Sequence, residues 1–208
     1  MQVSKHIHSC LLIKEKGKAV LIDPGCYSIE GKGVSADNID KLDYLLITHE
    51  HADHFDIPFI KELIQKFPSL TLISNEAVQS KLSTENVKAQ LEGDKFIEVV
   101  DAPHEHVFGA PQFQNTLFNV YSQLTHPGDN LHFNKTCKIL ALPVQAPWGS
   151  LTQAVEKAIE VKPEIVIPIH DWHWNEQARE AFYIRLKDYF SQHDIKFLGL
   201  QTGEVVEV

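Results

Sequence analysis

The chain reads Thr48-His49-Glu50-His51-Ala52-Asp53-His54 directly after a short apolar run at residues 42–47. In extended backbone, side chains two residues apart point to the same side, so His49 and His51 can bind one cation together. The turn that follows can direct Asp53 and His54 at a second cation. Chance alone would place HxHxDH in roughly two such chains per thousand. We therefore interpret residues 48–54, hereafter the histidine motif, as part of a metal centre, with a solvated polar loop as the alternative.

Further ligands are needed from outside the histidine motif, because one short segment cannot fill the coordination shells of two cations. The chain offers His104, Asp129 and His170, each just after an apolar run. Strands of one sheet deliver the residues that follow them to a common rim, so we expect these three side chains to meet the motif there. Each of them alone would more often be a surface or capping residue. Their recurrence at strand ends favours a shared site.

The apolar pattern predicts strands that alternate with amphipathic helices in the later part of the chain. Strands are expected at residues 7–13, 19–22, 42–47, 70–74, 95–100, 117–121, 139–144, 165–169 and near 196–200. Helices are expected at residues 57–67, 76–82, 151–160 and 175–190. Short apolar strands need cover on both faces, so the fold class is α/β, or α+β by a stricter definition. The chain contains no linker or repeat, so we expect one domain over residues 1–208.

Composition narrows the possible partners. The formal net charge is -9 and no basic run is present, which argues against a nucleic-acid partner. No apolar run approaches the roughly 20 residues that span a bilayer, which argues against a membrane. The amino terminus lacks a secretory signal and the three cysteines form no CxxC pair, so we expect a reducing, cytoplasmic location. A small-molecule substrate is therefore the expected partner.

Several stretches spread over nearly the whole chain form a recognisable set. They are His8-Ser9-Cys10, Leu21-Ile22-Asp23-Pro24-Gly25, the histidine motif, His104, His126-Pro127-Gly128-Asp129, Leu142-Pro143-Val144 and Ile167-Pro168-Ile169-His170. Together they resemble the metallo-β-lactamase fold hydrolases, and within that family the branch similar to ascorbate-6-phosphate lactonase. The resemblance implies a four-layer αββα sandwich, a metal-dependent hydrolase and a possible homo-oligomer.

The same resemblance implies a ligand set. One metal takes His49, His51 and His104, the other takes Asp53, His54 and His170, and Asp129 bridges both. His106 lies two residues from His104 and either imidazole could fill that place, with His104 favoured. Asp23 is expected to be a buried support and not a ligand. His126 is expected either to carry a proton or to make a structural hydrogen bond.

The expected chemistry follows from two neighbouring divalent cations. At about 3.5–4 Å apart they can share a water and lower its pKa to about 7, which would supply hydroxide as the nucleophile. Asp53 would orient this hydroxide, and water, His126 or His173 would protonate the leaving group. The expected substrate is a small, anionic ester, lactone or phosphodiester, because the cations outweigh the acidic chain locally. Among the metals that suit histidine and carboxylate, we expect zinc first and manganese second.

Two alternatives to a hydrolase would use the same residues. Redox-active di-iron relatives of this fold resemble HxExDH, with glutamate where this chain has His51, and Glu50 is out of register for that role. A redox function is therefore disfavoured. A noncatalytic metal-binding or scaffold protein of the same fold stays open, because intact ligands do not prove turnover. Trp148, Trp172 and Trp174 either form an aromatic wall for the substrate or pack against the core.

Overall fold

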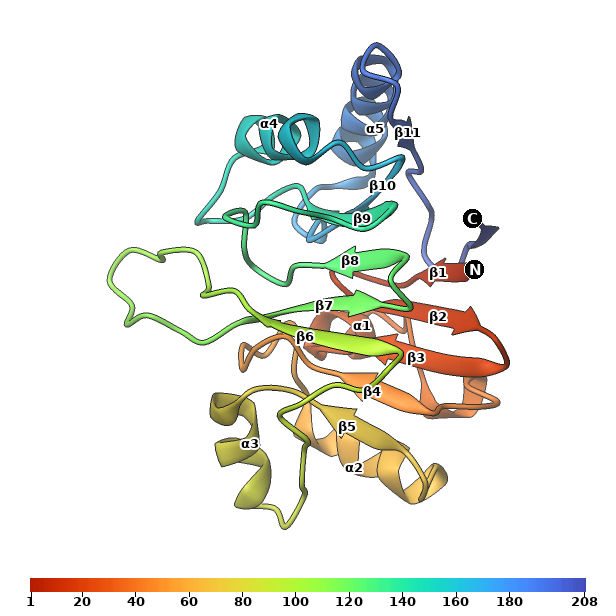
Figure 1. The fold of residues 1–208 in the computed structure, drawn as a ribbon, viewed down its shortest axis with the longest axis vertical. Coiled ribbons are helices and arrows are strands. Elements are labelled where there is room, and N and C mark those ends of the chain that lie inside the picture. Colours follow the sequence, from red (N-terminus) through yellow and green to blue (C-terminus); the bar gives the residue numbers. More distant parts are fainter.

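Two six-stranded sheets lie face to face in the computed structural model, which describes residues 1–208 (Figure 1). The first sheet has the order β12-β1-β2-β3-β4-β5, and the second has the order β11-β10-β9-β8-β7-β6. The first contains β1 (Gln2–Lys5), β2 (Leu11–Glu15), β3 (Lys18–Ile22), β4 (Tyr44–Leu46), β5 (Thr71–Ile73) and β12 (Val205–Glu207). The second contains β6 (Ile97–Asp101), β7 (Thr116–Val120), β8 (Leu124–His126), β9 (Ile139–Pro143), β10 (Ile165–Ile169) and β11 (Lys196–Phe197).

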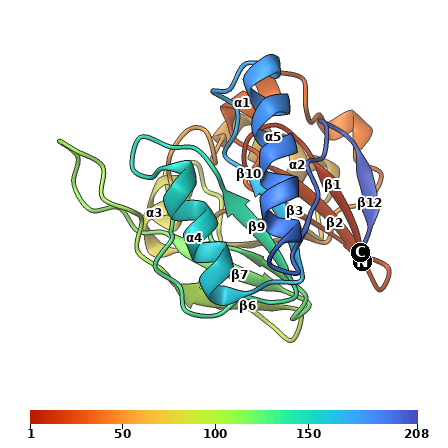
Figure 2. The ribbon, with the colours of Figure 1, turned by 90° about the horizontal axis from the view of Figure 1, so that it is seen from above.

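Helices cover the outer face of each sheet. They are α1 (Cys26–Glu30), α2 (Ile57–Lys66), α3 (Glu76–Ser83), α4 (Leu151–Val161) and α5 (Glu176–Ser191), with a short 3-10 helix at Ala36–Asn38. Buried residues of α2 and α3 pack with the outer face of the first sheet, and those of α4 and α5 pack with the outer face of the second. Figure 2 shows α4 and α5 side by side over the second sheet. These four layers confirm the predicted α/β class and αββα arrangement.

The alternation of side chains along β3 shows why its residues 19–22 are all apolar. Val20 and Ile22 point into the core between the sheets, while Leu21 points outward into the core under α2 and α3. A strand covered on both faces cannot alternate apolar and polar residues, so it reads as a continuous apolar run. The same reasoning holds for β10, whose five residues are all buried.

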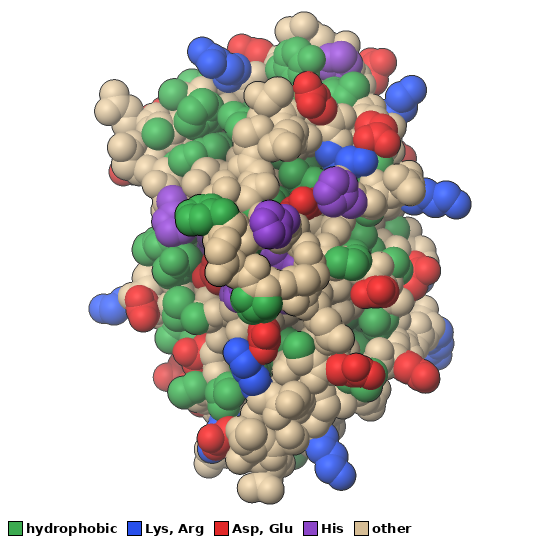
Figure 3. Space-filling view, turned by 90° about the vertical axis from the view of Figure 1, so that its left-hand side faces the viewer, with side chains coloured by type: hydrophobic (Ala, Val, Ile, Leu, Met, Phe, Trp, Pro, Cys, Tyr) green, Lys and Arg blue, Asp and Glu red, His purple; other side chains and the backbone are tan.

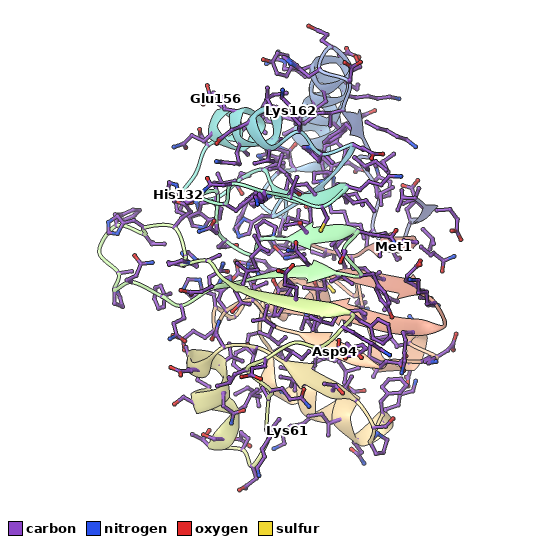
Figure 4. All side chains as sticks on the ribbon, in the orientation of Figure 1. Met1, Lys61, Asp94, His132, Glu156 and Lys162 are labelled. Atoms are coloured by element: carbon purple, nitrogen blue, oxygen red, sulfur yellow. The ribbon has the colours of Figure 1, made fainter.

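Strand directions bring the predicted site residues to one edge of the sandwich. β3, β4 and β5 run parallel, and so do β8, β9, β10 and β11, so the residues that follow these strands emerge at a shared rim. In Figure 1 this rim is the left-hand side, where the long connections lie. Figure 4 marks His132, between β8 and β9, on that side and Met1 at the opposite end of the strands.

Several predicted elements differ from those observed. The strand expected at 7–13 is interrupted, because His8 has a φ of 63° and the chain turns there between β1 and β2. The strand expected near 196–200 pairs only at Lys196–Phe197. β1, β8, β12 and α1 were not predicted, since each is short and includes polar residues that leave too little periodicity to stand out. None of the helices combines the length and the apolarity needed to cross a bilayer.

Candidate metal centre

The rim brings together the seven side chains predicted as ligands, with one further histidine. Their potential ligand atoms form two groups, and within each group these atoms lie within 4.8 Å of one another. One group contains His49, His51, His104 and Asp129, and the other contains His8, Asp53, His54 and His170. The first sheet contributes the histidine motif after β4, and the second sheet contributes His104, Asp129 and His170. The structure therefore places every predicted ligand in the cluster, and adds His8.

Asp129 lies between the two groups. Its Oδ2 is 3.3 Å from His104 Nε2 and 3.3 Å from His170 Nε2. Its Oδ1 is 3.3 Å from His54 Nε2. The side chain is only 3% exposed, so solvent cannot satisfy these oxygens. Asp129 therefore faces both groups, and its Oδ2 lies beside a histidine of each.

Three imidazoles are held by their Nδ1 atoms, and their Nε2 atoms face the centre. Nδ1 of His54 pairs with the Asp23 carboxylate at 2.8 Å, Nδ1 of His104 donates to the carbonyl of Glu105 at 2.6 Å, and Nδ1 of His170 donates to the carbonyl of Gln145. The three Nε2 atoms are buried and have no hydrogen-bond partner. An unpartnered buried polar atom is costly, and cations bound in the two groups would satisfy all three.

His49 and His51 present a second pair of converging nitrogens. Thr48 Oγ1 donates to Asp23, so it can accept the hydrogen of His49 Nδ1, 3.0 Å away. His49 Nε2 then lies 3.1 Å from His51 Nδ1. Two nitrogens that share a tetrahedral zinc at 2.0–2.1 Å are about 3.3 Å apart. The spacing of these donors therefore fits a cation of that size.

Asp23 supports the histidine motif from the end of β3. It is fully buried, and its carboxylate accepts hydrogen bonds from the backbone and side chain of Thr48 at 2.8 and 2.6 Å, in addition to its contact with His54. Gly25 follows two residues later, and a Cβ there would lie 2.0 Å from the backbone of Asp53, so only glycine permits this approach. These contacts match the supporting role expected for Asp23.

The electrostatics of the cluster suit cation binding. Burial opposes ionisation of Asp129, but the neighbouring imidazoles of His170, His54 and His49 outweigh it and hold its pKa well below the usual range. Burial lowers the pKa values of His49 and His51, which keeps both rings neutral. The Asp129 carboxylate raises the pKa values of His54 and His170 in spite of their burial. Metal binding and protonation therefore compete for these two rings.

Two alternatives left open by the sequence are separated by geometry. His104 is buried in the cluster, whereas His106 is exposed and lies outside it. His126 also lies outside: its Nε2 donates to the carbonyl of Ser9 at 2.9 Å, and its Nδ1 accepts from the backbone of Gly128 at 3.3 Å. With both ring nitrogens engaged by backbone, the structural role of His126 is favoured over proton transfer.

The three tryptophans divide between the two roles considered for them. Trp148 donates its indole N–H to Asp129 Oδ2 at 2.9 Å. Trp172 is 38% exposed and stacks on Tyr27, whose ring packs edge-on against His8. Trp174 packs on Phe182, away from the cluster. Figure 3 views the rim directly and shows histidine and apolar side chains side by side near the middle of that face.

His8 is the site residue that the sequence did not identify. It was noted within His8-Ser9-Cys10, but a lone histidine in a turn has no ligand spacing of its own. Its ring is buried, and its Nε2 lies 3.1 Å from Asp53 Oδ2. Burial, helped by His170, lowers its pKa to about 4, so the ring is neutral.

Known proteins share this architecture. Residues 2–170 match a family model described as the beta-lactamase superfamily domain. Protein Rv0786c of Mycobacterium tuberculosis is 29% identical over 201 residues, covering 90% of this chain and 92% of that protein. A UPF0173 metal-dependent hydrolase of Staphylococcus epidermidis is 28% identical, with 100% of both chains covered.

The comparison of solved structures agrees with the family match. The metallo-beta-lactamase fold protein YhfI of Bacillus subtilis superimposes with a TM-score of 0.70 at 16% identity, over 99% of this chain and 98% of that one. At this identity the likeness shows the fold. The matched residues include the histidine motif, Asp129 and His170. The chain therefore has the metallo-β-lactamase fold and belongs to the beta-lactamase superfamily domain family.

Proposed function

We propose that this protein is a metal-dependent hydrolase that uses two divalent cations to cleave an ester, lactone or phosphodiester bond in a small, anionic substrate. The observation that carries the proposal is the convergence of unpartnered, buried imidazole nitrogens on Asp129. The Staphylococcus epidermidis relative, named as a metal-dependent hydrolase, supports the same reaction class.

The ligands divide according to the two groups. His49, His51 and His104 would hold the first cation, Asp53, His54 and His170 the second, and Asp129 both. This donor set suits zinc first and manganese second. When bound, such cations lower the pKa of water and polarise a carbonyl or phosphoryl oxygen.

Local charge explains how an acidic chain attracts an anionic substrate. Two divalent cations and two carboxylates leave about +2 at the centre before solvent is counted. Lys81, near the histidine motif, is paired with Glu50 at 3.0 Å. The attraction for an anion therefore resides in the metal centre.

The remaining chemistry falls to two side chains at the mouth of the site. Asp53 is 23% exposed against 3% for Asp129, so it is the carboxylate that an attacking water can reach. It would orient that water and accept its proton. His173, which is exposed and has its ring centroid 6.3 Å from that of His8, would protonate the leaving group.

The test begins with elemental analysis of protein purified without chelator or added metal. We expect about two zinc or manganese ions per chain, and hydrolysis of at least one substrate among phosphodiesters, lactones and esters. Asp53→Ala should fold normally and lose at least about 100-fold in rate. Asp40→Ala, an exposed aspartate outside the cluster, is the matched control.

Other outcomes separate the alternatives. Protein that holds no metal and binds none on reconstitution would contradict the proposal. Two bound ions without turnover on any substrate would favour the noncatalytic metal-binding alternative. Iron as the bound metal would favour a redox function.

A further inference from the structure

His8 lies in a turn of the first sheet that is hydrogen-bonded to the second sheet at the rim. It lies between β1 and β2 with a φ of 63°, in the left-handed region that favours glycine. Its carbonyl accepts a hydrogen bond at 3.2 Å from the backbone N–H of His170, the residue that follows β10 of the other sheet. This bond fixes His8 relative to one of the predicted ligands.

The ring of His8 is directed at Asp53. Its Nε2 lies 3.1 Å from Asp53 Oδ2. An ionised carboxylate can only accept, so Nε2 carries the hydrogen. His170 lies against the ring at a centroid distance of 3.9 Å, and Tyr27 packs edge-on at 5.2 Å. These neighbours pack around the imidazole, whose N–H lies on the carboxylate.

Both the backbone conformation of His8 and the burial of its side chain are energetically unfavourable. A left-handed backbone is unfavourable for a residue with a Cβ. Nδ1 of His8 is buried with no hydrogen-bond partner. Its contact with Asp53 is the one hydrogen bond that the side chain makes. A strained residue retained for a single contact points to a functional use of that contact.

Asp53 is the ligand that most needs such support. The other predicted carboxylate, Asp129, receives the indole N–H of Trp148 and lies within 4 Å of four imidazoles. Asp53 is more exposed, and its Oδ2 is 3.9 Å from both His54 and His170. The hydrogen bond from His8 is the closest contact that fixes its direction.

We propose that His8 is a positioning residue whose Nε2–H holds Asp53 in the orientation that binds the second cation. The inference rests on the proposed function and adds a residue to it. His8 belongs to the second group of ligand atoms and not to the first. Its loss should therefore weaken the second cation and leave the cation held by His49, His51 and His104 unchanged.

The experiment is a zinc titration in competition with a chromogenic chelator. Wild-type protein should bind two ions. His8→Asn tolerates the left-handed backbone but is too short to reach Asp53, and should bind one ion normally and the other about 10–100-fold more weakly. His8→Gln extends an amide N–H toward Asp53 and should recover much of that affinity. His6→Asn is the matched control, because the His6 ring pairs with the carbonyl of Gly33 and lies outside the cluster.

A mutant cycle tests whether His8 acts through Asp53. Asp53→Ala should weaken the second ion by itself, and adding His8→Asn should then have no further effect. A merely structural role would give additive losses and would affect both ions. Circular dichroism of each variant checks that the fold is intact.

The wild-type protein provides a readout that needs no variant. Long-range ¹H–¹⁵N spectra of zinc-loaded protein should show His8 protonated on Nε2 and bare on Nδ1. An Nε2 without a proton would overturn the inference, because His8 would then be a ligand. If His8→Asn bound two ions with unchanged affinities, the role of His8 would be overturned while the proposed function would stand. If the wild type bound no ion, the proposed function would be overturned as well.

Discussion

Trp148 is a single residue whose hydrogen bond reaches the centre of the site. Its indole N–H donates to Asp129 Oδ2 at 2.9 Å, and its ring lies 5.6 Å from that of His170. Trp148→Phe keeps most of the ring and removes the donor. We expect zinc affinity to fall about 10-fold, because the carboxylate loses the group that fixes one of its oxygens. Chelator competition measures the change, and unfolding in urea should show a loss of only about 1 kcal/mol.

The matched control for this prediction is Trp174→Phe. Trp174 packs on Phe182, at a centroid distance of 4.7 Å, and makes no contact with the cluster. It should therefore leave zinc affinity unchanged. Equal affinities for wild type and Trp148→Phe would show that Asp129 is oriented by the histidines alone.

For single residues, the sequence could identify candidate metal ligands but not the groups that orient them. The spacing within the histidine motif marks His49, His51 and His54, and all seven predicted ligands lie in the cluster, where their binding of metal stays a prediction. The groups that fix the rings are backbone carbonyls of Glu105 and Gln145, which carry no residue-type signal. His8 was overlooked for a related reason, since its role depends on a turn and not on spacing.

Among the elements, those within clear apolar runs were predictable, and several short elements with polar residues were not. The core strands and α2, α4 and α5 follow the pattern expected from burial, because each packs an extended apolar face. β1 and β12 pair with each other at one side of the first sheet, where strands of four and three residues are too short to show a clear alternation. Their pairing depends on contacts more than 200 residues apart in the chain, which local pattern cannot report.

A buried ion pair connects β1 to the residue that follows His170. Lys5, the last residue of β1, contacts Asp171 at 2.6 Å and donates to the hydroxyl of Tyr183 on α5 at 3.0 Å. Burial would raise the pKa of Asp171, but Lys5 outweighs it and keeps the carboxyl ionised. Because Asp171 directly follows His170, this pair links β1 and α5 to a predicted ligand.

We expect Lys5→Met to destabilise the protein by about 3–5 kcal/mol, because it leaves a buried carboxylate without its cation. Tyr183→Phe removes a hydroxyl that accepts from Lys5 and donates to Asp171, and should cost about 2 kcal/mol. Lys18→Met is the control, since Lys18 forms a comparable pair with Asp43 but is 41% exposed, and should change stability by less than about 1 kcal/mol. Urea unfolding measures all three. Similar losses for Lys5→Met and Lys18→Met would show that burial adds nothing to the Lys5 pair.

On the scale of the whole molecule, the site exists only when the two sheets are packed together. The first sheet supplies the histidine motif and the second supplies His104, Asp129 and His170. Resemblance to a family predicted this four-layer fold, and the structure and the family match confirm it. The substrate could not be predicted, because one fold serves many reactions and the sequence shows no clamp for a particular group.

Since the cluster is assembled by folding, stability should depend on pH through its imidazoles. Burial lowers the pKa values of five histidines, His6, His8, His49, His51 and His126. These rings are neutral when folded and take up protons when unfolded below about pH 6.5, so their contribution to stability grows as pH rises. His54 and His170, whose pKa values are raised chiefly by Asp129, contribute in the opposite direction.

Acidification lowers the contribution of five histidines to folding stability and raises that of two, so we expect a net loss of stability. Chelator-treated protein should lose at least about 1 kcal/mol of stability between about pH 7 and about pH 5, measured as a lower urea midpoint. The carboxylates act in the same direction at lower pH, because the pKa of Asp129 is depressed and its contribution is lost as pH falls toward that value. Zinc-loaded protein should show a steeper dependence, since protons then compete with metal for His54 and His170 as well. A urea midpoint that stays constant or rises on acidification would mean that these two rings outweigh the other five.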